Sequence, residues 1–312
     1  MPAGDRLCRL PAPYADREAP AVPAPRGRSG PRSRSRVTAW HSTPPPGSLI
    51  VTFYGAYGRE FDDGTVPIAA LIRLLGAVGV DPPSVRSAVS RLKRRGLLVP
   101  AHAGSKSAGY APSAAARQLL EDGDRRIYSR PRPDGSWLLA VFSVPESERR
   151  RRHVLRSRLA RLGFGNAAPG IWLAPSHLEE ETRHTLQRLE LTAYVDLFRG
   201  THAGFEPTAE AVARWWDLAA IGELHRAFLE THEPVLRSWA RRRRVPPEEA
   251  YRDYLLALDA WRRLPYADPG LPASLLPPDW PGERAARVFA GLHARLRDAG
   301  AEYPALLRGA AG

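Results

Sequence analysis

The segment from residue 82 to residue 95 constrains the fold of this chain most, because its two faces need different surroundings. Asp81 suits a helix N-cap, Pro82 suits the first helical position, and Gly96 suits the position just past the end. The spacing therefore predicts a helix over Pro82–Arg95. Its apolar face, which must be buried, consists of Val85, Ala88, Val89 and Leu92. Its opposite face combines serines with arginines and has no acidic residue: Ser84, Arg86, Ser87, Ser90, Arg91 and Arg94.

The surroundings of this helix predict a winged helix-turn-helix. We expect two helices before it, over Leu49–Tyr57 (capped by Ser48) and Ile68–Leu75, a hairpin within residues 97–111, and a helix from Ser113 to Leu120. In such a fold the third helix enters the major groove of DNA and the hairpin tip meets the adjacent backbone. The expected tip of the hairpin is turn-rich and basic, because the stretch from His102 to Ser107 holds Gly104 and Lys106. A generic helical domain whose third helix is basic by chance is the alternative.

The charge of the whole chain also favours a polyanionic partner. Lysine and arginine number 46 against 33 acidic residues, which gives a formal net charge of +13. Nucleic acid, acidic lipid or a phosphorylated ligand would suit this balance. Residues 1–46 are rich in proline and hold eight arginines against three acidic residues, so we expect a disordered basic arm there. Biased codon usage explains the preference for arginine over lysine, but it explains the excess over acidic residues less readily.

The sequence disfavours several other classes of protein. Its single cysteine, Cys8, rules out an intrachain disulfide and fits a reducing cytoplasm. Because no run of about 18 apolar residues occurs, we expect no membrane span. The motifs HExxH, GxSxG and the P-loop are missing, so we expect neither an enzyme nor a cofactor or metal site. One helical face with His177, Glu181 and His184 gives a weak hint of a metal site, but such surface faces are common.

The middle of the chain alternates between strand and helix patterns. Trp137–Val144 is a continuous apolar run typical of a buried strand, and Val154, Leu155, Leu159 and Leu162 form the apolar stripe of a helix over residues 147–162. A loop over 163–170, strands at 171–174 and 191–198, and a helix at 177–189 follow. This order predicts a ferredoxin-like α+β sandwich. A metal-dependent nuclease of similar fold would need a carboxylate at the end of the first strand, and Trp137–Val144 contains none.

Helices dominate the remainder. We expect them over residues 209–230, 235–243, 246–263 and 283–299, with a packed, proline-rich link at 264–282. The predicted fold class is α+β. The predicted domains are a disordered basic arm at 1–46, a winged helix-turn-helix at 47–122, a ferredoxin-like α+β middle domain at 123–206, and a helical C-terminal domain at 207–312.

Three stretches of the sequence are similar to those of one known family. They are SLIVTFYGAYGRE with VRSAVSRLKRRGLL near the N-terminus, LGFGNAAPGIWLAP in the middle, and WRRLPYADPGLPASLLPPDWPGERAA near the C-terminus. The last stretch is long and irregular enough to be specific. Between about Gly47 and about Ala299, the chain resembles the PaaX family of repressors of phenylacetate catabolism.

The resemblance implies a cytoplasmic homodimer that represses transcription. Its winged helix would bind a partly palindromic operator, and an aryl-acetyl-CoA such as phenylacetyl-CoA would release it. The recognition role would fall on the polar face of the third helix (Arg86, Ser87, Ser90, Arg91, Arg94). The wing role would fall on His102, Gly104, Ser105 and Lys106. A nonspecific or architectural nucleic-acid-binding protein without a CoA effector remains the main alternative, and the metal-dependent nuclease is another.

An effector of this kind needs an aromatic or apolar slot and cations for the CoA phosphates. Residue type selects these candidates for the ligand-binding site: Trp172, Trp215, Trp239, Tyr254, Trp261, Arg262 and Arg263. Ordinary core packing is the usual role of such aromatic residues, and a solvated or paired surface position is the usual role of such arginines.

Overall fold

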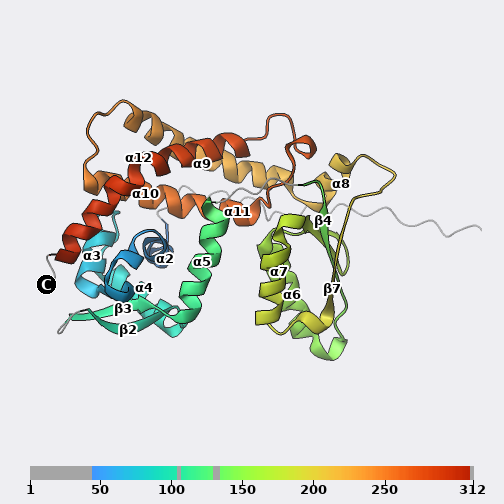
Figure 1. The fold of residues 1–312 in the computed structure, drawn as a ribbon, viewed down its shortest axis with the longest axis horizontal. Coiled ribbons are helices and arrows are strands. Elements are labelled where there is room, and N and C mark those ends of the chain that lie inside the picture. Colours follow the sequence, from blue (N-terminus) through green and yellow to red (C-terminus); the bar gives the residue numbers. More distant parts are fainter. Residues whose placement is uncertain (1–43, 104–106, 129–133, 310–312) are drawn as a thin grey trace, which may run out of the picture. The chain divides into compact units, whose positions relative to one another are not determined.

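Residues 46–112 fold into helices followed by an antiparallel hairpin. The structure is a computed structural model, and it describes residues 44–103, 107–128 and 134–309. The helices are α2 (Pro46–Ala56), α3 (Ile68–Gly76) and α4 (Pro82–Arg94). Strands β2 (Leu98–Ala103) and β3 (Ser107–Pro112) form the hairpin, and β1 (Val66–Pro67) pairs with the free edge of β3 (Figure 1). This order of helices and hairpin is the one that the sequence predicts.

Helix α4 begins and ends where its local chemistry dictates. Oδ1 of Asp81 accepts a hydrogen bond of 2.9 Å from the backbone N–H of Ser84, which satisfies a donor that the first helical turn leaves open. Gly96 adopts a positive φ of 67° just past the helix. The predicted apolar face is buried, since Val85, Ala88, Val89 and Leu92 are each at most 4 % exposed.

The middle of the chain forms a second antiparallel sheet, in the strand order β5-β6-β4-β7. α5 (Ala114–Tyr128) precedes it. The elements follow one another as β4 (Trp137–Phe142), α6 (Arg149–Leu162), β5 (Gly165–Ala168), β6 (Ile171–Pro175), α7 (Glu179–Arg188) and β7 (Val195–Gly200). Helices α6 and α7 cover one face of the sheet (Figure 1), where Leu155, Leu159 and Leu186 share a core with Leu138 and Ala140 of β4.

The last third of the chain is helical. Its helices are α8 (Thr208–Trp215), α9 (Leu218–Ala240), α10 (Pro247–Trp261), α11 (Leu264–Ala267) and α12 (Gly282–Gly309). Short 3-10 segments connect the main elements: η2 (Gly58–Glu60), η3 (Asp62–Gly64), η4 (Glu146–Glu148), η5 (Ser176–Leu178), η6 (Thr192–Tyr194) and η7 (Ala273–Leu275). These helices and the two antiparallel sheets confirm the α+β class. None of the helices in the described ranges is long and apolar enough to span a bilayer.

One hydrophobic core joins the N-terminal helices to the C-terminal ones. It contains Leu49, Ile50 and Phe53 of α2 together with Leu255 and Leu258 of α10, all of them almost fully buried. The ring of Tyr57 packs against Tyr251 and Tyr254 of α10, with centroid distances of 5.6 and 6.0 Å. Aromatic contacts of this kind add to the stability that area burial supplies. The helix that packs under α4 is therefore also in contact with α10.

Two predicted helices in the last third were wrong. The helix predicted over 209–230 is instead two helices, α8 and α9, with a break at Trp216. The side chain of Asp217 caps α9 by accepting a hydrogen bond of 3.0 Å from the N–H of Ala220. Pro234, predicted to begin a new helix, lies inside α9. Proline in a helix interior loses one backbone hydrogen bond. Burial of Phe228 and Trp239 on either side of Pro234 offsets that loss.

Several other predictions also need correction. Ser48 does not cap α2, because the helix begins at Pro46 and Ser48 lies inside its first turn, where its hydroxyl donates to Asp259. α5 extends to Tyr128 rather than stopping at Leu120, because its last turn stacks on Phe289 of α12, 6.4 Å between ring centroids. The expected loop at 163–170 contains β5, which pairs with β6. α12 runs on to Gly309, and Val154, predicted to be buried, is 39 % exposed.

Candidate nucleic-acid interface and effector site

The polar face of α4 is exposed and carries uncompensated positive charge. Arg86, Ser87, Ser90, Arg91 and Arg94 are all exposed, and Ser84 is half-buried at the start of the helix. Among the described residues, no acidic side chain pairs with Arg86, Arg91 or Arg94. Nη1 of Arg91 donates a hydrogen bond of 3.1 Å to Oγ of Ser87, which holds the guanidinium along the helix face. Such a face supplies both the cations that phosphates need and the short donors that base edges accept.

Two further cations lie beside the polar face of α4 and were not among the predicted DNA-binding residues. Lys93 and Arg95 are exposed at the C-terminal end of α4, next to Arg94. The signal for them was present, because the run from Arg91 to Arg95 contains no acidic residue. Neither of the two faces predicted from the sequence includes them.

Of the contacts predicted on the hairpin, the structure describes only His102. His102 is exposed near the end of β2, opposite Ala108 of β3. Gly104, Ser105 and Lys106, the predicted tip, lie outside the described residues. Ser113 anchors the base of the hairpin, because its hydroxyl donates 2.8 Å to the carbonyl of Gly96 and accepts 3.1 Å from the N–H of Ala116. The hairpin and the end of α4 are thus held together.

The predicted aromatic residues of the effector site do not converge on one pocket. Trp172 belongs to the core of the middle sheet, while Trp215 packs at 5.9 Å on Trp137, between ring centroids. Trp239, Tyr254 and Trp261 share the core of the C-terminal helices. Each of these three has a defined structural contact. Trp239 donates 2.8 Å to Asp253, Tyr254 lies 2.7 Å from Nδ1 of His293, and Trp261 stacks on Phe289 at a centroid distance of 4.8 Å.

The predicted phosphate-binding arginines share a buried carboxylate. Arg262 Nε lies 3.3 Å from Oδ1 of Asp259, and Arg263 Nη2 lies 2.8 Å from its Oδ2. Asp259 is fully buried, and its Oδ1 also accepts hydrogen bonds of 2.6 Å from Ser48 and 2.7 Å from Thr52. A buried carboxylate requires such compensation. Both guanidinium groups are therefore occupied in joining α10 to α2.

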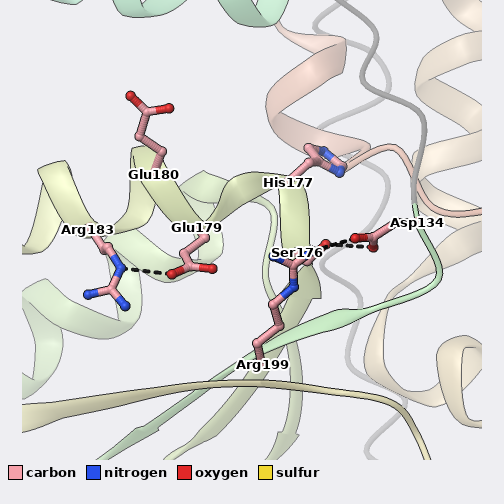
Figure 2. A pocket seen from close by; sticks show the side chains of 7 residues that line it. All are labelled: Asp134, Ser176, His177, Glu179, Glu180, Arg183 and Arg199. Carbon is pink, nitrogen blue, oxygen red and sulfur yellow. Dashed lines mark hydrogen bonds and ion pairs between the residues drawn. The ribbon is translucent and has the colours of Figure 1, made fainter.

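An open pocket of about 450 Å³ on the middle sheet contains charges that compensate one another. Figure 2 shows Arg199 reaching toward Ser176 and Asp134, and Arg183 paired with Glu179. Hydrogen bonds from Ser136 and Ser176, together with Arg199, hold the pKa of Asp134 well below its usual range. Because both arginines already have carboxylate partners, this pocket lacks the uncompensated cations that a CoA phosphate needs.

A metal site is not assembled in the part of the chain that the structure describes. No group of three His, Cys, Asp or Glu side chains there is placed to hold an ion. Glu181 instead lies 3.2 Å from Nε of Arg126, a side chain that also donates to the carbonyl of Leu162 and covers the ring of Tyr266 at 4.6 Å. Burial raises the pKa of Glu181 and lowers that of Arg126. Arg126 therefore connects α5 to helices α6 and α7 of the middle region and to α11.

Comparison with known proteins gives consistent matches along the chain. Residues 45–116 match the family model for PaaX-like proteins, 130–212 the model for the PaaX central Cas2-like domain, and 216–305 the model for the PaaX-like C-terminal domain. The transcriptional repressor PaaX of Escherichia coli (strain K12) is 27 % identical over 263 residues, covering 81 % of this chain and 80 % of the relative. The solved structure of an uncharacterized protein, Rv0674, from Mycobacterium tuberculosis is similar with a TM-score of 0.50 and 22 % sequence identity. The match covers 86 % of this chain and 99 % of the other chain. At that identity the match concerns the fold alone.

Proposed function

The chain belongs to the PaaX family, and from this premise we propose that it is a DNA-binding transcriptional repressor. The observation that carries the proposal is the exposed, acid-free face of α4. A helix that is buried on one side and carries unpaired arginines and serines on the other suits the major groove. Arg86, Ser87, Ser90, Arg91 and Arg94 would make the contacts, with Ser84 at the helix start and His102, Ser105 and Lys106 on the hairpin.

The arrangement around α4 supports the interpretation as a winged helix-turn-helix. Three helices lead directly into the hairpin of β2 and β3, and α2 packs beneath α4 through the shared core. The elements of the middle sheet follow the order strand, helix, strand, strand, helix, strand, which supports a ferredoxin-like domain there. Homodimer formation, which would place two such helices on a partly palindromic operator, is part of the same proposal.

We further propose that an aryl-acetyl-CoA, such as phenylacetyl-CoA, releases the repressor from genes of aromatic catabolism. The support is the family and the name of the bacterial relative, which is called a transcriptional repressor. An effector acts only by binding the DNA-competent and DNA-incompetent states with different affinities. Affinity for DNA would come mainly from phosphate contacts, and specificity from a few side chains of α4.

A mobility-shift titration tests this function. The full chain first selects its preferred duplex from a random-sequence library, and the complex is then titrated with phenylacetyl-CoA, free CoA and phenylacetate. Release by phenylacetyl-CoA at concentrations where free CoA has no effect would support the proposal. Equal indifference to all three compounds would contradict the effector and favour a nucleic-acid-binding protein without one.

A further inference from the structure

A small cavity lies between α2, which contacts α4, helix α5 and helices of the C-terminal region. Its volume is about 60 Å³, and α2, α5, α10 and α11 all contribute to its wall. The lining is mainly apolar, with two tyrosine rings, one guanidinium and the carboxylate of Asp124, which is ion-paired with Arg59 at 2.6 Å. The residues that matter most are Leu120, Ile127, Leu258, Tyr128, Tyr266 and Arg262. Arg262 is the only member of the predicted ligand-binding set that lines this cavity. A mainly apolar slot with one cationic group, which is already paired with Asp259, suits an aromatic ring whose oxygen acceptor competes for that guanidinium.

Two helical glycines keep the cavity open. Gly55 of α2 and Gly123 of α5 both line it, and neither has a positive φ. A Cβ at Gly55 would lie 3.4 Å from Cδ2 of Leu120, and one at Gly123 would lie 3.7 Å from the hydroxyl of Tyr266. Glycine inside a helix costs about 0.5 to 1 kcal/mol relative to alanine. Since the backbone at these positions does not require glycine, the missing side chains serve to leave space.

The cavity also borders the bonds that join α2 to α10. Thr52 and Arg262 both line it, and both are hydrogen-bonded to the buried carboxylate of Asp259, at 2.7 and 3.3 Å. Arg262 also donates 2.8 Å to the hydroxyl of Ser48 in the first turn of α2. A molecule that draws the Arg262 guanidinium toward itself would therefore remove a contact that fixes the start of α2.

Displacement of α2 would reach the DNA-binding face directly. Ile50 and Phe53 of α2 belong to the same core as Val85, Ala88 and Leu92, which form the buried side of α4. Protein interiors are closely packed, so a shift of one helix moves the side chains of its neighbour. The polar face of α4 is the opposite side of that same helix.

We propose that this cavity binds the aromatic acyl end of the effector, which enters between α2, α5 and α10 and accepts a hydrogen bond from Arg262. The inference rests on the proposed function. A cavity of about 60 Å³ is smaller than the roughly 150 Å³ that accommodates benzene in a protein core. The ligand therefore fits only a state in which α5 and α10 stand further from α2, and its binding shifts the population toward that state and away from DNA.

Either an aryl-acetyl thioester or the free arylacetic acid could present the required ring and oxygen. The test is isothermal titration of the DNA-free full chain with phenylacetyl-CoA and, separately, with phenylacetate. The variants are Gly55→Ala with Gly123→Ala, and Gly123→Ala alone. Gly76→Ala is the matched control, because a Cβ at this helical glycine meets no atom within 4 Å.

The double variant should fold with an unfolding midpoint at or above that of the wild type, since alanine favours a helix more than glycine does. It should keep its operator affinity. Its Kd for the ligand should rise about tenfold or more, because one added methyl group in a close-fitting apolar slot has an effect of that size. The single variant should show a smaller increase, and Gly76→Ala none. An unchanged Kd in the folded double variant would overturn the proposed binding site but not the proposed effector. A wild-type chain that binds neither compound would overturn the proposed effector, and this inference with it.

Discussion

The hydroxyl of Thr52 in α2 donates a hydrogen bond of 2.7 Å to the carboxylate of Asp259 in α10, across 207 positions of the sequence. Ser48, one turn earlier, donates to the same oxygen at 2.6 Å. Both contacts join the first two turns of α2 to the C-terminal end of α10, where Arg262 and Arg263 balance the buried charge. The helix that supports α4 is thus attached to the C-terminal helices by a polar cluster as well as by the core.

Asp259→Ala should destabilise the chain substantially. Removing one member of a buried ion pair typically costs about 3 to 5 kcal/mol, because the partners lose their compensation. Arg262 and Arg263 are partly exposed and regain water, so we expect the lower end of that range, about 3 kcal/mol. Chemical denaturation measures the loss. Asp279→Ala, at an exposed position, is the control and should change the free energy of unfolding by less than about 0.5 kcal/mol. Equal stability of the two variants would show that the cluster contributes nothing.

Arg91→Ala and Arg94→Ala should weaken operator binding. A residue that reads a base should cost about 1 to 3 kcal/mol on the selected operator and relax the preference at one position. A residue that contacts phosphate should weaken all sequences alike and lower the salt dependence of the binding constant. Fluorescence anisotropy over a range of salt concentrations distinguishes the two roles. Arg237→Ala, an exposed position on α9, should bind as the wild type does. Wild-type binding by both α4 variants would remove this helix from the interface.

Arg126→Ala should loosen the attachment of α5 to helices α6 and α7 of the middle region. The guanidinium side chain is only 8 % exposed, and its loss leaves Glu181 and the carbonyl of Leu162 without their cationic partner. We expect a loss of about 3 kcal/mol in the free energy of unfolding. Arg125→Ala is the control, since the neighbouring side chain is 65 % exposed and its ion pair with Asp122 should contribute less than about 1 kcal/mol. Comparable losses from both substitutions would contradict this role of Arg126.

His232 should make stability depend on pH. Burial lowers the pKa of His232 from 6.5 to about 4, and its ring packs on Phe228 at a centroid distance of 4.8 Å. Asp253, the nearby carboxylate, only partly opposes this shift. As the pH falls from 6.5 to about 4, the unfolded chain takes up a proton that the folded chain does not, so stability decreases with falling pH. The loss amounts to roughly 3 kcal/mol below that window.

The contribution of His232 is isolated by comparing urea midpoints of the wild type and His232→Asn between pH 7 and pH 4. The decrease should be smaller in the variant, because asparagine does not titrate there. His153→Asn, at an exposed position, should reproduce the wild-type profile. A His232→Asn profile parallel to that of the wild type would contradict the assignment.

The sequence predicted α4 closely because everything that defines this helix is local. Its cap, its proline, its glycine stop and both faces lie within sixteen residues. The same local reasoning failed at Pro234, because packing on both sides of the proline outweighs its helix-breaking effect. It also missed β5, whose residues Gly165–Ala168 are small and show no alternation, so only pairing with β6 defines the strand.

The candidate sites differ in the same way. The polar face of α4 could be identified from one helix, whereas the role of Asp259 depends on α2, which is distant in the sequence. In the sequence, Asp259 precedes Arg262 and Arg263 by three and four positions, which is the spacing of ordinary surface ion pairs on a helix. The tryptophans were selected by residue type, and the structure divides them among separate cores. Gly55 and Gly123, which matter most for the cavity, have no distinguishing pattern in the sequence.

The most direct test of the account is the ratio of two dissociation constants, measured at physiological ionic strength with the full chain. One is for the duplex that the chain selects from a random library, and the other is for a scrambled duplex of the same length and composition. Sequence reading by α4 predicts that the selected duplex binds about a thousandfold more tightly or better, and that Arg91→Ala with Arg94→Ala reduces this ratio. Equal affinity of the wild type for the two duplexes would contradict the account, because a nonspecific protein attracted by phosphate charge alone would behave in that way.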